Sequence, residues 1–174
     1  TLTILFVLNG LQVWFYDFRG PTSGLRTFAK EIREDKYQNS LVLVAPDVLS
    51  MTFGYYLPKE EREKHKVIIR GFTRWEDPFT PPNMYSMPAQ WQPTSVVEEC
   101  EKRIDDEAKS TGWKYLAFVE ANQDWVRATT TKDMPRSFRI AALKQKLQSK
   151  YREVSKKFYP AALEDVTVTV YELK

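Results

Sequence analysis

Four charged side chains stand at or just beyond the ends of short apolar runs in this sequence: Asp47, Arg74, Asp77 and Glu120. The clearest run is Leu41–Pro46, which ends directly before Asp47. If these runs are parallel strands, their carboxyl ends meet at one edge of a sheet, where open α/β folds bind their ligands. We therefore expect these four side chains to surround one polar binding site.

Aromatic residues accompany these charges. Tyr55 and Tyr56 follow Asp47 within ten residues, and Trp75 lies next to Arg74. Arginine, tryptophan and carboxylates together bind sugars and polar head groups through stacking and paired hydrogen bonds. The alternative for the aromatic residues of the irregular stretch 71–92 is a flap that closes the open end of the sheet. The tyrosine pair and Trp75 are therefore added to the candidate binding residues.

The sequence contains no complete set of catalytic or metal-binding residues. The only histidine, His65, falls in the charged run Lys59–Lys66, which we expect to be a solvated turn or helix. The only cysteine, Cys100, shares a helical face with Val97 and Ile104, so we expect it in the core. Glycine-rich phosphate loops and the motifs HExxH and GxSxG are absent. We therefore assign no catalytic residue, no metal ligand and no cofactor.

The charge of the chain argues against nucleic acid as a partner. The 26 basic and 23 acidic residues are mixed along the sequence and give a net charge of +3, without the dense basic stripe of a nucleic-acid-binding module. Lysine and arginine crowd the segment 144–157, which we interpret as a solvated helix face. An anionic membrane surface is the alternative partner for this segment. The carboxylates of the predicted helix 93–111 are also expected to face solvent.

Hydrophobic periodicity predicts helices and strands that alternate along the chain. The predicted helices cover 22–35, 48–56, 93–111 and 136–155, and the predicted strands cover 41–47, 66–72, 113–121 and 166–173. Val166–Leu173 alternates valine with threonine and tyrosine, which is typical of a strand near a sheet edge. This order predicts an α/β fold, a three-layer Rossmann-like sandwich with a mostly parallel sheet of about four or five strands. One domain is expected over residues 19–174.

The apolar segment 1–18 has two interpretations. In the first, Thr3–Leu8 is a buried strand that ends at the turn Asn9-Gly10. In the second, the segment is the end of a membrane helix, with Trp14–Phe18 as an aromatic belt at the interface. The segment is shorter than the ~20 residues of a complete membrane helix. Composition alone favours the strand.

Landmarks spread over nearly the whole chain resemble those of a known family. They are an apolar segment that ends in aromatic residues, an amphipathic helix, Leu43-Val44-Ala45-Pro46-Asp47, the pair Tyr55-Tyr56, the stretch Gly71–Pro78, and a closing Phe158-Tyr159-Pro160 with Val166–Leu173. In this order they are similar to the C-terminal soluble, extracytoplasmic domain of membrane-embedded glycosyltransferases that use polyprenyl-phosphate sugars. The resemblance is to the protein-mannosyltransferase and lipid A aminoarabinose-transferase type, in particular to bacterial and cyanobacterial relatives.

The resemblance implies that residues 1–18 are the end of the last membrane helix and that the following domain lies on the periplasmic or lumenal side. In this family, acidic residues of the membrane portion act in sugar transfer, so the domain is an accessory without a catalytic residue. The membrane portion of the same polypeptide, the membrane surface and a lipid-linked sugar or acceptor are the implied partners. The alternative is an independent soluble Rossmann-like enzyme or small-molecule-binding domain, with Asp47, Arg74, Asp77 and Glu120 around one pocket.

Overall fold

The computed structural model describes residues 23–45, 48–72, 93–121, 134–161 and 164–173 of the chain. The segment 1–18, with its two interpretations, lies outside these ranges. The helices and strands are, in chain order, α2 (Gly24–Arg33), β1 (Ser40–Ala45), α3 (Val48–Tyr56), α4 (Lys59–Lys64), β2 (Val67–Gly71), α5 (Pro93–Thr111), β3 (Tyr115–Ala121), α7 (Met134–Lys150), β4 (Arg152–Tyr159) and β5 (Val166–Glu172).

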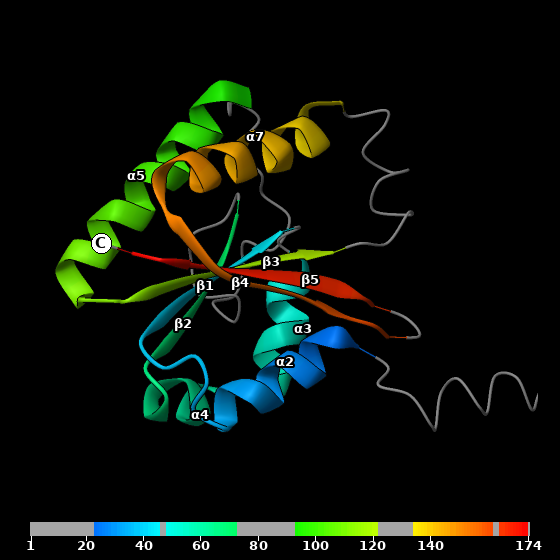
Figure 1. Cartoon of the computed structure of the whole chain (residues 1–174). Coiled ribbons are helices and arrows are strands. Elements are labelled where there is room, and N and C mark those ends of the chain that lie inside the picture. Colours follow the sequence, from blue (N-terminus) through cyan, green and yellow to red (C-terminus); the bar gives the residue numbers. More distant parts are fainter. Residues whose placement is uncertain (1–22, 46–47, 73–92, 122–133, 162–163, 174) are drawn as a thin grey trace, which may run out of the picture.

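The described strands form one sheet in the order β2-β1-β3-β5-β4. β1 pairs in parallel with β2 and with β3, whereas β5 is antiparallel to both of its neighbours, β3 and β4. Four of the five strands therefore run in one direction. The sheet is the middle of three layers, with α5 and α7 on one face and α2, α3 and α4 on the other (Figure 1). This confirms the predicted α/β sandwich.

β1 shows why the run Leu41–Ala45 is apolar without interruption. Leu41 and Leu43 belong to the core between the sheet and α5 and α7, and Val42 and Val44 belong to the core on the opposite face. Every side chain of the strand is buried, because helices cover both faces. Local composition was therefore sufficient to identify this strand.

The core between the sheet and α2 is built around aromatic rings. Phe28 of α2 stacks on Phe53 of α3 with 5.4 Å between the ring centroids, and it meets Tyr159 of β4 at 5.7 Å. The Tyr159 hydroxyl donates a hydrogen bond to Glu31 Oε2 at 3.0 Å, and Lys157 forms an ion pair with the same carboxylate. These contacts attach α2 to the outer strand β4.

α2 begins beside the carboxyl end of β3. The Ser23 hydroxyl caps the helix and also donates a 2.5 Å hydrogen bond to Glu164 Oε2. The Gly24 N–H donates to the Glu164 carbonyl oxygen at 2.7 Å, and burial raises the pKa of the Glu164 carboxyl. Glu164 precedes Val166, which is opposite Ala121 at the end of β3. The described chain therefore enters the domain at this end of the sheet.

The last helix ends earlier than the sequence predicted. α7 ends at Lys150 and β4 begins at Arg152, whereas the predicted helix continued to Ser155. Leu147 of the predicted apolar face is buried, but Val154 is 50% exposed on β4. Val154 continues the helical period of apolar residues, and no glycine or proline marks the boundary between helix and strand.

The alternating strand 166–173 lies near the sheet edge, as the second strand from it. β5 lies between β3 and β4, and β4 is the outer strand. The sequence predicted no strand over Arg152–Tyr159, because its charged residues do not alternate with apolar ones. The hairpin partner of β5, which is the outer strand of the sheet, was therefore missing from the prediction.

Gly24 offers a test of the close packing between α2 and the β4–β5 hairpin. A Cβ atom at this position would lie 2.6 Å from the Tyr159 carbonyl oxygen and 3.1 Å from Val166 Cγ2. A backbone oxygen cannot move aside without disturbing the strand. We expect Gly24→Ala to lower the free energy of unfolding by about 1–3 kcal/mol in urea denaturation, although alanine is the better helix former.

Gly112→Ala is the matched control. A Cβ atom there would meet nothing within 4 Å, but Gly112 has φ of +70°, so the expected cost is about 1 kcal/mol of backbone strain. A Gly24→Ala protein as stable as the wild type would contradict the described contact between α2 and the hairpin.

Candidate functional site

The carboxyl ends of β1, β2 and β3 lie side by side at one edge of the sheet. In the parallel register, Ala45 is opposite Glu120, and Val44 is opposite Gly71. The Phe72 N–H donates to the Val44 carbonyl oxygen at 3.0 Å, so the chain leaves β2 close to β1. This is the edge at which the sequence predicted a binding site, and we call it the carboxyl edge.

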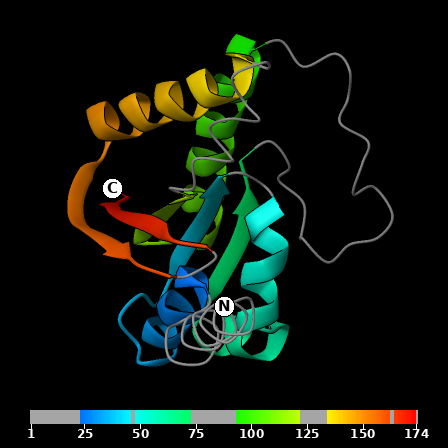
Figure 2. The same cartoon turned by 90° about the vertical axis from the view of Figure 1, so that its right-hand side faces the viewer.

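The order of the strands reverses at β1. After β1, the chain passes through α3 and α4 on one face of the sheet and returns as β2 on one side of β1. After β2, it passes through α5 on the opposite face and returns as β3 on the other side of β1 (Figures 1 and 2). Open α/β sheets bind ligands where the connections leave on opposite faces, which here is between the carboxyl ends of β1 and β3.

Glu120 is the predicted residue that the structure places at this point. It alternates along β3 with Leu116 and Phe118, so its side chain lies on the face covered by α5 and α7. Lys144 of α7 donates a hydrogen bond from Nζ to Glu120 Oε2 at 2.6 Å, and each side chain is 25% exposed. An ammonium has three protons and a carboxylate has two oxygens, so this ion pair retains capacity to bind a polar ligand.

The sequence did not predict Lys144 as a site residue. Lys144 belongs to the crowded basic segment that was interpreted as a solvated helix face, and it meets Glu120 across 24 positions of the chain. No local pattern links two residues at that separation. To predict this pair, one would need to know both the position of β3 in the sheet and the residue at which α7 begins.

The structure separates the tyrosine pair from the carboxyl edge. α3 begins after β1 and runs toward the amino ends of the strands, where it ends at Tyr56. There the Tyr56 carbonyl oxygen accepts a 2.5 Å hydrogen bond from Arg33, and Arg33 lies 3.7 Å from Glu61 of α4. Tyr55 is 79% exposed, and the centroids of the Tyr55 and Tyr56 rings lie 5.5 Å apart in a T-shaped arrangement. The pair is therefore not brought together with Glu120.

The remaining four predicted residues lie outside the described residues: Asp47, Arg74, Trp75 and Asp77. In the sequence, Asp47 follows shortly after β1, and the other three follow shortly after β2. Both strands end at the carboxyl edge. The grouping of these residues with Glu120 stays a prediction.

The helices add a favourable potential for negative charge at the carboxyl edge. α2 begins next to the end of β3, and α3, α5 and α7 run from this side of the sheet toward the amino ends of the strands. None of these four helices has an acidic residue in its first turn. The partial positive charges of the helix amino ends are therefore not neutralised from within their own first turns.

The histidine that the sequence placed in a solvated turn is buried. The His65 side chain is 3% exposed, with Nδ1 2.8 Å from Asp35 Oδ1 and Nε2 3.4 Å from Glu61 Oε2. Hydrogen bonds from Gln38 and His65 lower the pKa of the Asp35 carboxyl. These residues stand at the turns before β1 and β2, at the amino ends of the strands, and so lie away from the carboxyl edge. The expectation of a solvated histidine was wrong because its partner Asp35 is distant in sequence.

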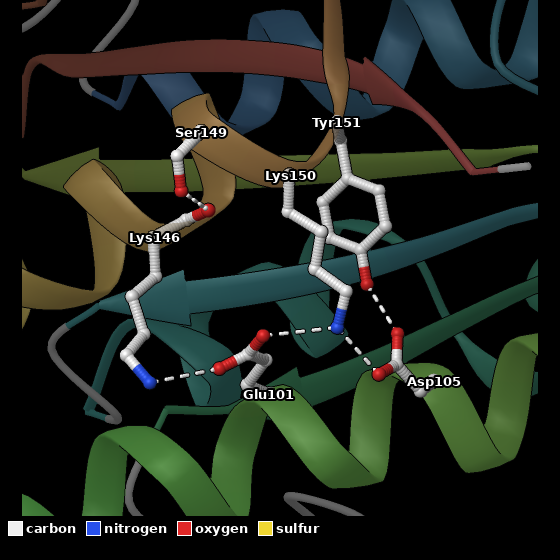
Figure 3. Close-up of polar contacts among 6 residues, drawn as sticks. All are labelled: Glu101, Asp105, Lys146, Ser149, Lys150 and Tyr151. Atoms are coloured by element: carbon white, nitrogen blue, oxygen red, sulfur yellow. Dashed lines mark hydrogen bonds and ion pairs between the residues drawn. The ribbon is translucent and has the colours of Figure 1, made fainter.

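A network of charges joins α5 to α7 (Figure 3). Lys150 donates hydrogen bonds to Glu101 Oε1 at 2.9 Å and to Asp105 Oδ2 at 2.5 Å. Lys146 donates to Glu101 Oε2 at 3.0 Å, and the Tyr151 hydroxyl donates to Asp105 Oδ1 at 2.5 Å. The sequence indicated two solvated faces for these residues, whereas in the structure the two charged faces meet.

The pKa shifts show that the network stabilises its charged groups. Hydrogen bonds from Lys150 and Lys146 lower the pKa of Glu101. Burial raises the pKa of Asp105, but hydrogen bonds from Lys150 and Tyr151 outweigh burial and lower it. Desolvation opposes the charge of Lys150, but its two carboxylate partners outweigh desolvation and raise its pKa. The network thereby holds α7, and with it Lys144, in place above the sheet.

Among the described residues, no group of three or more histidine, cysteine, aspartate or glutamate side chains could hold a metal ion. In the same part of the chain, no helix combines the length and the apolar character needed to cross a membrane. Comparison with protein-family models, with curated proteins and with solved structures found no match to this chain.

The network between α5 and α7 predicts a dependence of stability on pH. The folded state lowers the pKa of Glu101 and Asp105 from their ordinary values of 4.5 and 3.8. Their contribution is therefore fully present above these values and is lost as the pH falls through the lower, folded-state values. At pH 7 we expect Asp105→Asn to lower the free energy of unfolding by about 1–2 kcal/mol, with the difference shrinking below the ordinary pKa of Asp105, measured by urea denaturation at a series of pH values.

Glu99→Gln serves as the control. Glu99 pairs with Arg103 one helical turn away on α5, and both side chains are exposed, so this change is expected to cost less than about 0.5 kcal/mol. If the wild type and Asp105→Asn lost stability in parallel as the pH fell, Asp105 would not be part of a stabilising network.

Proposed function

We propose that this domain is the accessory extramembrane part of a glycosyltransferase that moves a sugar from a lipid-phosphate donor to an acceptor. The sequence landmarks that motivate the proposal fall on key elements of the fold. Leu43-Val44-Ala45 is the carboxyl end of β1, and Tyr55-Tyr56 is the end of α3. Phe158-Tyr159 is the end of β4, and Val166–Leu173 contains β5. The domain is proposed to recognise a substrate or partner and to leave the chemistry to the membrane portion.

One observation carries the proposal. The described chain enters at Ser23, which is bound to Glu164 beside the end of β3. The point of entry and the carboxyl edge are therefore on the same side of the domain. An anchor formed by the preceding segment 1–18 would hold the carboxyl edge toward the membrane, on its periplasmic or lumenal side, with the lipid-linked donor and the membrane portion in front of it.

The carboxyl edge offers the chemistry of a recognition surface. The ion pair of Glu120 and Lys144 presents both signs of charge, and the helix amino ends favour negatively charged groups such as a phosphate. Arg74 and Trp75 follow β2 in the sequence and would add an arginine and a stacking surface for a sugar. In this role the side chains bind and orient polar groups and transfer no proton.

A second candidate function is an independent small-molecule-binding domain or soluble enzyme. The observation that favours it is the reversal of strand order between β1 and β3, which is a common ligand site in proteins of many functions. Both functions use the carboxyl edge. An accessory domain takes part in turnover only when it is joined to the membrane portion, whereas an independent domain binds or converts its ligand alone.

Glu120→Gln in the full-length protein tests the recognition role. The change keeps the shape of the side chain and removes its charge from the ion pair with Lys144. We expect KM for the donor or the acceptor to rise about fivefold with kcat nearly unchanged, because the variant loses a binding contact that is equal in the ground state and the transition state. Steady-state measurement of sugar transfer with each substrate varied in turn gives both constants.

Glu172→Gln is the matched control, because Glu172 pairs with Arg152 at the opposite end of the sheet. It should leave both constants unchanged. The 174-residue chain alone is expected to bind without sugar transfer, and turnover by it would refute the accessory role. Ligand binding by this chain, combined with no sugar transfer by the full-length protein, would instead establish the small-molecule-binding function.

A further inference from the structure

β4 is the outer strand at one edge of the sheet. It pairs with β5 on one side, and within the described part of the chain no strand pairs with its other side. Seven of its eight residues are exposed or half-exposed, so the helical layers bury only its last residue, Tyr159. β4 runs along one side of the molecule (Figure 2). An open edge of this kind presents unpaired backbone N–H and C=O groups that another strand can bind.

Apolar side chains on β4 also lack cover. Val154 is 50% exposed and Phe158 is 54% exposed. They are two of the three large hydrophobic side chains that are exposed in the described part of the chain, and the third is Tyr55. Their concentration on the outer strand favours a partner over a random distribution of surface residues.

Two charges on β4 have no ion-pair partner among the described residues. Arg152 is paired with Glu172, and Lys157 is paired with Glu31. Glu153 and Lys156 are exposed, and no ion pair with a described residue neutralises either of them. The strand therefore carries one available negative charge near its start and one available positive charge near its middle.

Glu153 and Lys156 lie on the same face of the sheet. Glu153 is opposite Tyr171 and Lys156 is opposite Thr169, and these two residues of β5 share one face because they are two positions apart. The register of β4 shifts between Glu153 and Ser155. This irregularity is what allows two residues three positions apart to share a face.

We propose that β4 pairs antiparallel with β4 of a second copy of this chain, so that two five-stranded sheets become one continuous sheet. With the twofold axis between Val154 and Ser155, Glu153 of each copy lies opposite Lys156 of the other, on the same face. Arg152 then lies opposite Lys157, but each of these two is paired with a carboxylate of its own copy, Glu172 and Glu31. Symmetry makes this contact twice. Val154 is covered at the centre of the interface, and the open backbone groups of both strands are paired.

The charge pattern selects this arrangement over parallel pairing. In a parallel in-register pair, Glu153 would meet Glu153 and the two lysines would meet lysines, which is destabilising. The lysines thereby protect the edge from unspecific pairing while they permit the antiparallel twofold pair.

Sedimentation equilibrium of the 174-residue chain, from low to high micromolar concentration, tests the proposal. The wild type is expected to form a dimer. Glu153→Lys and Lys156→Glu each place like charges opposite one another at both contacts, so each is expected to raise the dimer dissociation constant about tenfold or more. The double variant Glu153→Lys/Lys156→Glu restores opposite charges at both contacts and is expected to return the constant to near the wild-type value.

Glu98→Lys and Lys102→Glu on the exposed face of α5 are the matched controls and should leave the dissociation constant unchanged. Circular dichroism of every variant confirms that the fold is retained. A wild type that stays monomeric at all concentrations overturns the proposal. So does a dimer that is insensitive to both single variants, or one that the double variant fails to restore. Protection of the β4 amides from hydrogen exchange at high but not at low concentration would place the dimer contact on this strand.

Discussion

The parallel pairing of β1 with both of its neighbours is the constraint on which the rest of the structure depends. Parallel strands cannot be joined by a tight turn, so the chain must cross a face of the sheet each time it returns to a neighbour of β1. One crossover uses α3 and α4 and the other uses α5, on opposite faces. The buried run Leu41–Ala45, the two apolar cores and the reversal at the carboxyl edge all follow from this pairing.

Directional contacts then fix where the helices lie on the apolar faces. Apolar packing tolerates small displacements of a helix, whereas hydrogen bonds between charged groups have defined distances and angles. α7 is fixed to α5 through Lys150 and to β3 through Lys144, and α2 is fixed to β4 through Glu31. The position of the charged side chains at the carboxyl edge therefore depends on ion pairs between the helices and the sheet.

The sequence predicted the parts of the fold whose signals are local. The run Leu41–Ala45 was predicted as a buried strand, and the predicted helices 48–56 and 93–111 have the bounds of α3 and α5. Each of these signals lies within a few residues of its effect. The sequence failed where the deciding contact is distant. The buried His65 is bound to Asp35, which is 30 positions away. β4 is a strand because β5 pairs with it, although its own residues continue the helical pattern of α7. The candidate site was predictable as an edge of the sheet and as Glu120, but not as the pair with Lys144.

The junction between α7 and β4 has a mechanical consequence. Tyr151 is the single residue between the end of the helix and the start of the outer strand, and its hydroxyl is bound to Asp105 of α5. No loop separates the two elements, so a displacement of α7 along or across its axis must also displace the start of β4. Lys144 lies in the middle of α7, and the outer strand β4 follows the carboxyl end of the same helix. A ligand that shifts the ion pair of Glu120 and Lys144 would therefore also shift the position of β4 through α7.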